Sequence, residues 1–188
     1  MIAAIFVALF SYFGVFTVER KVMFPMMGIT LSFLLVPMLI LIIHDVGKIA
    51  VPDYILLKPD KLTDEEFEKI KLHAQKGGEM IKGIFSNFAD EELLEQAYNI
   101  AIAHHEKWNG KGYPKGLCGE DIPLEARLMA IADVFDALVS DRVYKKAIPP
   151  EEAFNIIISG AGNHFDPDII EILVSIKDDF IAAAKEAV

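Results

Sequence analysis

The chain is poor in three kinds of residue, and each shortage narrows what it can be. One cysteine among 188 residues cannot form an internal disulfide, which fits a reducing compartment. Basic residues number 18 against 28 acidic ones, and the net charge of −10 argues against a broad DNA- or RNA-binding surface. The first 43 residues hold only three charged side chains, adjacent to one another at 19–21. This segment therefore needs an interpretation separate from the rest.

The uncharged front end predicts a membrane segment. Residues 1–18 are an unbroken apolar run that would reach about 27 Å as a helix, enough for the hydrocarbon core of a bilayer. A second apolar run, 22–43, is broken by two prolines and a glycine. Either both runs span as a hairpin, or only the first spans and the second is a core helix. We favour one membrane-spanning or apolar segment at 1–21, because the second run continues without a linker into His44 and Asp45.

From residue 44 onward the apolar residues recur with helical periodicity, and neither strand-like alternation nor an internal repeat is present. The pattern predicts helices within 62–81, 91–105, 124–140 and 168–176, joined by loops at 52–63, 108–123 and 145–150. The sequence thus predicts one all-α bundle over 22–188.

Two helix starts carry recognisable end signals. Thr63 with Glu66 three residues later forms a capping box, and Asp166-Pro167 is typical of an N-cap followed by the first helical position. Along 62–81, Phe67 and Ile70 begin an apolar face that is predicted to be buried.

Polar side chains interrupt these apolar stripes at positions where burial is costly. A single histidine on such a stripe is more often a hydrogen-bonded core residue than a ligand. Six polar residues together change this interpretation, since a buried, unpartnered carboxylate costs several kcal/mol. A pair of divalent metals would satisfy them all, and mixed imidazole and carboxylate ligands suit iron, manganese or zinc. The six are His44, Asp45, His73, His104, His105 and Asp133.

Five ordered motifs carry a family resemblance. They are "HDVGKIAVPDYILLKPDKLT", "KLHAQKGGEMI", "HHEKWNGKGYPKGL", "GEDIPLEARLMAIADVFDALVSDRVYKKA" and "GAGNHFDPDII", spread over 44–173. In order and spacing they resemble the HD-GYP branch of the HD-domain phosphohydrolases, which are bacterial hydrolases of the signalling dinucleotide cyclic di-GMP. The resemblance implies an HD-domain helical bundle and a metal-dependent phosphodiesterase. The apolar front end adds the expectation that the protein is associated with the inner membrane, with its catalytic domain in the cytoplasm.

The resemblance also implies roles for individual residues. Asp45 would bridge two divalent metals, iron or manganese being expected; His44 and Asp133 would complete one site, and His73, His104 and His105 the other. Substrate-binding residues would be Lys48, Arg142 and Lys145 at the phosphates and Gly112, Tyr113 and Pro114 in the GYP loop, a segment also implicated in contacts with signalling partners. Lys48 is in addition a candidate proton donor to the leaving oxygen. Glu106 would orient a ligand histidine, and His164 would be structural.

One departure from the family pattern qualifies the expected activity. Family members place a further histidine roughly thirty residues before the His-Asp doublet, where this chain has "ALFSYFGVFTV". One metal would therefore lack a protein ligand, and hydrolysis would be weakened. Two alternatives follow: a degenerate domain that binds cyclic di-GMP as a receptor without cleaving it, or a truncated fragment whose true N-terminal helices are absent.

Overall fold

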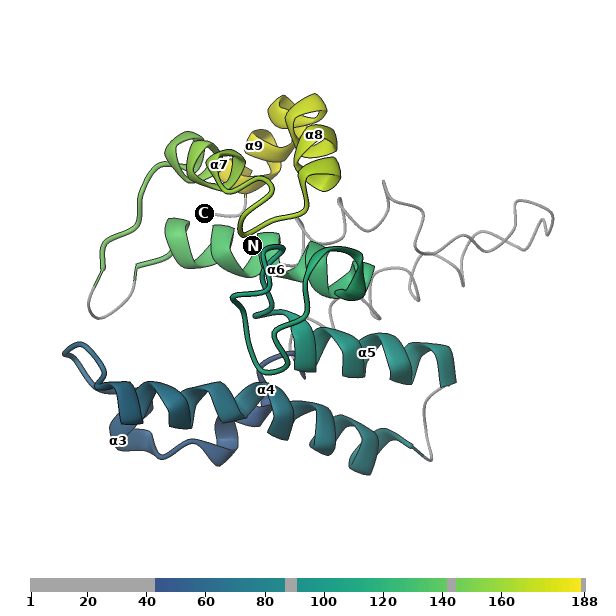
Figure 1. Cartoon of the computed structure of the whole chain (residues 1–188). Helices are drawn as coiled ribbons and strands as arrows, with labels where there is room; N and C mark the ends of the chain where they lie inside the picture. The colour runs from purple at the N-terminus through teal and green to yellow at the C-terminus, as the bar shows by residue number, and fades with distance from the viewer. Residues whose placement is uncertain (1–42, 87–90, 142–144, 187–188) are drawn as a thin grey trace.

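The computed structural model describes residues 43–86, 91–141 and 145–186, and in these ranges the chain is helical without a β-strand (Figure 1). The predicted all-α class is confirmed. Seven α-helices and two short 3-10 helices (η) follow one another in the described residues: η1 (Val46–Ala50), α3 (Asp53–Leu56), α4 (Asp64–Phe85), α5 (Glu91–Ala103), η2 (Gly119–Asp121), α6 (Leu124–Val139), α7 (Pro150–Ser159), α8 (Pro167–Ser175) and α9 (Lys177–Glu186).

Both predicted end signals are present. The Thr63 side chain accepts a hydrogen bond from the Glu66 amide at 3.2 Å, and the Glu66 carboxylate accepts one from the Thr63 amide at 2.8 Å. Asp166 accepts from the Asp168 amide at 2.9 Å, with Pro167 as the first helical residue. These bonds satisfy backbone donors that have no partner inside the helix, which fixes where α4 and α8 begin.

The predicted loops need correction. The stretch 52–63 contains the four-residue helix α3, and 108–123 contains η2. Helices α7 and α9 were not assigned from the sequence. Elements of three or four residues are too short to show a 3.6-residue period, so periodicity could not have revealed α3 or η2.

The helices pack in sequence order, with α6 in the middle of the bundle (Figure 1). Helix α4 packs on η1 and α5, α5 on α6, and α6 on α7, while α8 and α9 pack against α7 and each other. Burial is greatest along α6, where Leu128, Ile131 and Phe135 are fully enclosed. The Phe135 ring meets Phe180 edge-on at 4.8 Å between ring centroids, an arrangement that aromatic pairs prefer.

Glycine allows η1 to lie directly on the backbone of α4. A Cβ atom at Gly47 would stand 1.9 Å from the His73 carbonyl oxygen and 2.4 Å from the Gly77 nitrogen. The opposing position is also a glycine, Gly77. This contact brings the His44-Asp45 turn, just before η1, against the middle of α4, where His73 lies.

The apolar front end lies almost wholly outside the described residues. The predicted membrane segment 1–21 and the run 22–42 are not described, and Ile43 packs at the edge of the main core. Among the helices of the described ranges, none combines the length and the apolar character needed to cross a membrane.

Candidate metal centre and adjacent cavities

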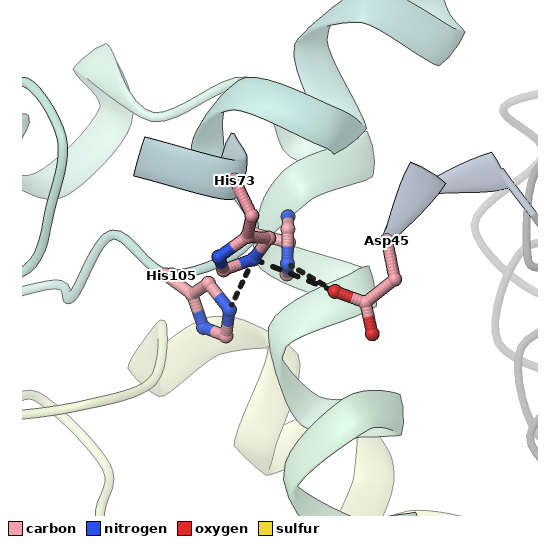
Figure 2. Close-up of side chains that lie close together, drawn as sticks. Asp45, His73 and His105 are labelled. Atoms are coloured by element: carbon pink, nitrogen blue, oxygen red, sulfur yellow. Dashed lines mark hydrogen bonds and ion pairs between the residues drawn. The ribbon is translucent and has the colours of Figure 1, made fainter. Parts of the chain in front are cut away.

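Four of the predicted ligands converge on one point. Asp45 comes from the turn before η1, His73 from α4, and His104 and His105 from the turn directly after α5. One ligand atom from each lies within 4.8 Å of the others. Asp45 Oδ1 is 3.4 Å from His73 Nε2 and 3.9 Å from His104 Nε2, and the Nε2 atoms of His73 and His105 are 3.1 Å apart (Figure 2).

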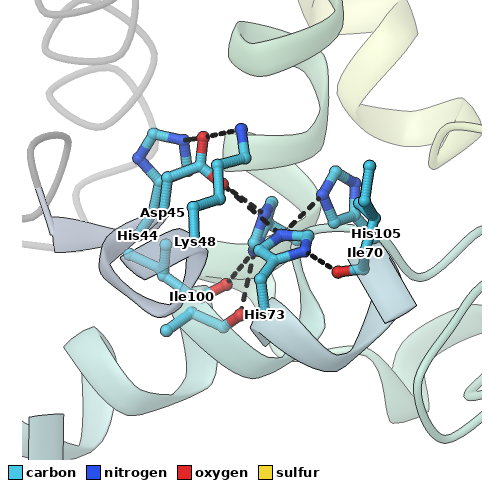
Figure 3. Close-up of polar contacts among 9 residues, drawn as sticks. His44, Asp45, Lys48, Ile70, His73, Ile100 and His105 are labelled. Atoms are coloured by element: carbon cyan, nitrogen blue, oxygen red, sulfur yellow. Dashed lines mark hydrogen bonds and ion pairs between the residues drawn. The ribbon is translucent and has the colours of Figure 1, made fainter. Parts of the chain in front are cut away.

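Backbone carbonyls orient two of these imidazoles. His73 Nδ1 lies 2.5 Å from the Ile70 carbonyl oxygen, and His104 Nδ1 lies 2.9 Å from that of Ile100 (Figure 3). A carbonyl oxygen can only accept, so each Nδ1 carries the proton and each Nε2 presents its lone pair to the cluster. The Ile100 carbonyl also accepts the His104 amide at 3.0 Å, so both the ring and the backbone of His104 are held to the last turn of α5.

The cluster fits a cation better than it fits a closed hydrogen-bond network. Asp45 Oδ1 and His104 Nε2 are buried and have no hydrogen-bond partner in the described part of the chain. Leaving such atoms unpaired costs roughly 1–3 kcal/mol each. A divalent cation among these four donors would satisfy both atoms, so the residues present fit a metal site.

The charges of the cluster also suit a metal. Burial lowers the pKa of His104 to about 3 and depresses the pKa values of His73 and His105. All three are therefore neutral at neutral pH, the form that binds metals. Burial works against ionisation of Asp45, but the hydrogen bond and charge of His44, together with Lys48, hold the pKa of Asp45 well below its ordinary range.

His44 and Lys48 contact the other carboxylate oxygen of Asp45. His44 Nε2 lies 3.3 Å and Lys48 Nζ 2.5 Å from Asp45 Oδ2 (Figure 3). Asp133 lies on α6 and lines a cavity of about 270 Å³ with His104 and Lys48, among others. His44 and Asp133 are thus next to the cluster without belonging to its closest four donors, and their role as ligands stays a prediction.

The predicted GYP loop covers one side of the cluster. The Tyr113 ring stacks on His105 with ring centroids 4.7 Å apart, and the Tyr113 amide donates to the His105 carbonyl at 3.2 Å. Gly112 leaves no room for a side chain, since a Cβ atom there would lie 2.4 Å from the Glu106 Cα atom. Pro114 is exposed. The loop thus lies directly beside a candidate ligand.

Glu106 has a different contact from the one expected. Its carboxylate accepts backbone N–H groups from Lys115 at 2.7 Å and from Gly116 and Leu117 at 3.1 Å each. The side chain is 2% exposed, and burial raises its pKa despite these bonds. Glu106 therefore holds the far end of the GYP loop in place of orienting a ligand histidine.

The other predicted phosphate-binding residues are not brought to the cluster by any described contact. Arg142 lies outside the described residues. Lys145 is half-buried and lines neither of the two cavities beside the cluster. Their substrate contacts stay predictions.

A larger cavity of about 740 Å³ shares Lys48, His105 and Tyr113 with the smaller one. Its remaining lining includes Phe67 and the lysines of the α3–α4 loop, Lys58 and Lys61. Sequence reasoning missed all three. Phe67 was expected in the core, but its side chain is 44% exposed and lines this cavity. The two lysines of "KPDK", residues 58–61, could have indicated an anion-binding loop.

His164 lies at the smaller cavity, and its titration should affect stability. Its ring stacks on Phe165 at 4.3 Å, and burial, aided by the charge of Lys107, lowers the pKa of His164 from 6.5 to about 4. As the pH falls below 6.5, the unfolded chain takes up a proton that the folded chain refuses, so stability is lost between pH 6.5 and about 4.

We therefore expect His164→Asn to lose less stability than the parent when the pH is lowered from 7 to 5. Urea unfolding at both pH values measures this, with the difference between variant and parent removing the contribution of the other histidines. Equal losses in the two proteins would contradict the expected titration of His164.

The comparison with protein families decides the classification. A family model described as an HD domain matches residues 39–169 of the chain. The chain belongs to the HD-domain family. With the Gly112-Tyr113-Pro114 segment and the relatives below, it falls in the HD-GYP branch.

Several curated relatives of this HD domain carry enzyme names. A cyclic di-GMP phosphodiesterase from Vibrio cholerae is 49% identical over 142 residues, covering 76% of this chain and 29% of that protein. A cyclic di-GMP phosphodiesterase from Thermotoga maritima is 42% identical, covering 73% of this chain and 36% of its own length. The 3'3'-cGAMP-specific phosphodiesterase 2 of Vibrio cholerae is 44% identical, and the alignment covers 74% of this chain and 26% of that protein. The aligned region thus spans between 26% and 36% of the length of these relatives.

A solved structure has the same fold. A protein described as HDG"Y"P from Bdellovibrio bacteriovorus aligns with a TM-score of 0.60 and 24% identity, covering 94% of this chain and 50% of that one. At this identity the likeness concerns the fold alone.

Proposed function

We propose that this HD domain is a metal-dependent phosphodiesterase that hydrolyses cyclic di-GMP. The main support is the convergence of Asp45 with three neutral imidazoles, two of which, His73 and His105, line a cavity of about 740 Å³. Pockets of roughly 300–1,000 Å³ accept ligands of this size class. The relatives named cyclic di-GMP phosphodiesterases support the same substrate.

The proposed reaction assigns a task to each group. A bound divalent cation would lower the pKa of a coordinated water towards about 7 and so supply a nucleophile at neutral pH. Asp45 and the imidazoles, neutral because they are buried, would fix the position of that nucleophile. Lys48, which lines both cavities, would neutralise phosphoryl charge and donate a proton to the leaving oxygen as the phosphorus–oxygen bond breaks.

We propose two cations, with iron or manganese as the expected metals. His73, His104 and His105 would hold one of them, His44 and Asp133 would hold the other, and Asp45 would bridge the two. The contact of His44 with Asp45 and the position of Asp133 at the smaller cavity support this division. The missing upstream histidine would leave the second cation more weakly held, and activity correspondingly reduced.

Incubation of the full chain with cyclic di-GMP and Mn²⁺ or Fe²⁺, followed by chromatography of the nucleotides, tests the proposal. We expect slow conversion to a linear product by the parent and none by His44→Ala. Parallel incubation with 3'3'-cGAMP tests the specificity named for another relative. Tight calorimetric binding without turnover would contradict hydrolysis and favour the receptor alternative.

The location of the protein is likewise a proposal. We propose that residues 1–21 anchor the HD domain at the cytoplasmic face of the inner membrane and that the GYP loop is open to a signalling partner. The uncharged run 1–18 followed by Arg20 and Lys21 supports the anchor, and the exposure of Pro114 supports the open loop. Release of the protein from membranes by salt alone would contradict the anchor.

A further inference from the structure

The cavity of about 740 Å³ is larger than the chemistry of a single phosphodiester requires. Its inner end is formed by Lys48, His73 and His105 of the candidate metal centre. Its outer part is formed by a different portion of the chain, the end of α3, the α3–α4 loop and the first turn of α4. We call this the outer subsite; its lining residues are Leu56, Lys58, Asp60, Lys61, Leu62 and Phe67.

The outer subsite combines apolar walls with the side chains of Lys58 and Lys61. Leu62 is half-buried, and the Phe67 ring lies edge-on to Tyr113 with ring centroids 6.2 Å apart, so aromatic surface continues from the GYP loop into the cavity. Apolar and aromatic walls are suited to a nucleobase, because any of the bases can stack on an aromatic ring.

The two lysines of the outer subsite differ in their contacts. Lys58 Nζ is held by Glu66 at 2.6 Å. Lys61 is exposed and forms no ion pair with any residue in the described ranges. Its ammonium group is thus available to an anion entering the cavity, although Asp60 beside it also lines the wall.

These observations lead to a division of the substrate. We propose that the outer subsite binds the nucleoside and the second phosphate of the dinucleotide, the phosphate that is not being cleaved, with Lys61 as its counter-charge and Phe67 as a wall for the base. This inference rests on the proposed function, since it presumes that the scissile phosphate lies at the metal centre. It makes Lys61 a determinant of substrate affinity with no part in the chemical step.

Charge reversal at Lys61, compared with the same change at Lys69, tests the inference. Lys69 is exposed on α4 and lines neither cavity, so Lys69→Glu matches the change in net charge. We expect Lys61→Glu to raise KM for cyclic di-GMP about tenfold with kcat within about twofold, because the lost contact is the same in the ground and transition states. Lys69→Glu should leave both constants unchanged.

A second substrate separates binding from chemistry. Bis(4-nitrophenyl) phosphate has one phosphodiester and no second phosphate, so its hydrolysis by Lys61→Glu should equal that of the parent. Equal KM values for cyclic di-GMP in Lys61→Glu and Lys69→Glu would overturn the inference while the proposed hydrolysis stands.

If the parent binds cyclic di-GMP without cleaving it, the proposed hydrolysis fails and calorimetric Kd values decide the inference instead. A tenfold weaker Kd for Lys61→Glu than for Lys69→Glu then supports the outer subsite. Equal Kd values, or no binding by the parent, overturn it.

Discussion

Replacing Asp45 by asparagine is expected to release the bound cation and to reduce phosphodiesterase activity by more than about 100-fold. Loss of a residue that only orients a metal ligand costs up to about 100-fold, and loss of a ligand itself should cost more. The substitution would keep the volume of the side chain but remove the only carboxylate among the four converging donors. The neutral amide would also leave Lys48 without its ion-pair partner at 2.5 Å. Metal content by mass spectrometry and turnover of cyclic di-GMP measure the two losses.

The matched control for this change is Asp121→Asn on η2. Asp121 is exposed, is not one of the four converging donors and lines neither cavity beside them. The same loss of one negative charge should therefore alter neither metal content nor turnover. Metal retained at the parent level by Asp45→Asn would contradict the assignment of the cluster as the metal site.

Gly47→Ala is expected to destabilise the fold by more than about 3 kcal/mol, at or above the usual cost of overfilling a core. The added methyl group would meet the His73 carbonyl oxygen at 1.9 Å and the Gly77 nitrogen at 2.4 Å. Both atoms belong to the backbone of α4 and cannot rotate away. Relief therefore requires η1 to move off α4, which would carry Asp45 away from His73 and reduce metal affinity as well. Chemical unfolding and metal titration measure the two effects.

A second glycine in α4 provides the control. A Cβ atom at Gly83 would meet nothing within 4 Å, and alanine is favoured over glycine inside a helix by about 0.5–1 kcal/mol. Gly83→Ala should therefore leave stability unchanged or slightly raised. A Gly47→Ala protein as stable as Gly83→Ala would show that η1 is not held against α4 as described.

The ligand cluster could be predicted because helical periodicity carries it. His73 and His104 fall on the same stripes as residues that proved buried, such as Ala74 and Ile100. A polar side chain forced inward by its helical position needs a partner, and four donors did converge. The start of α4 could also be predicted, because a capping box is formed within four consecutive residues and can be recognised in the local sequence.

Other features depended on contacts between distant segments and left no local signal. Phe67 fits the apolar stripe of α4, yet its side chain is 44% exposed and lines a cavity. The position of Glu106 directly after the histidine pair suggested a role at the ligands. Its carboxylate instead accepts hydrogen bonds from three backbone N–H groups of residues 115–117.

That convergence limits how the segment after α5 can be altered. Exposed loops ordinarily tolerate insertion of a tag or reporter domain. Here one buried carboxylate accepts hydrogen bonds from amides nine, ten and eleven residues further on. The length of the intervening chain is therefore fixed, although Asn109, Lys111 and Pro114 within it are exposed. Any lengthening between 107 and 114 would pull those amides away from Glu106, and chain fusions are better attached elsewhere.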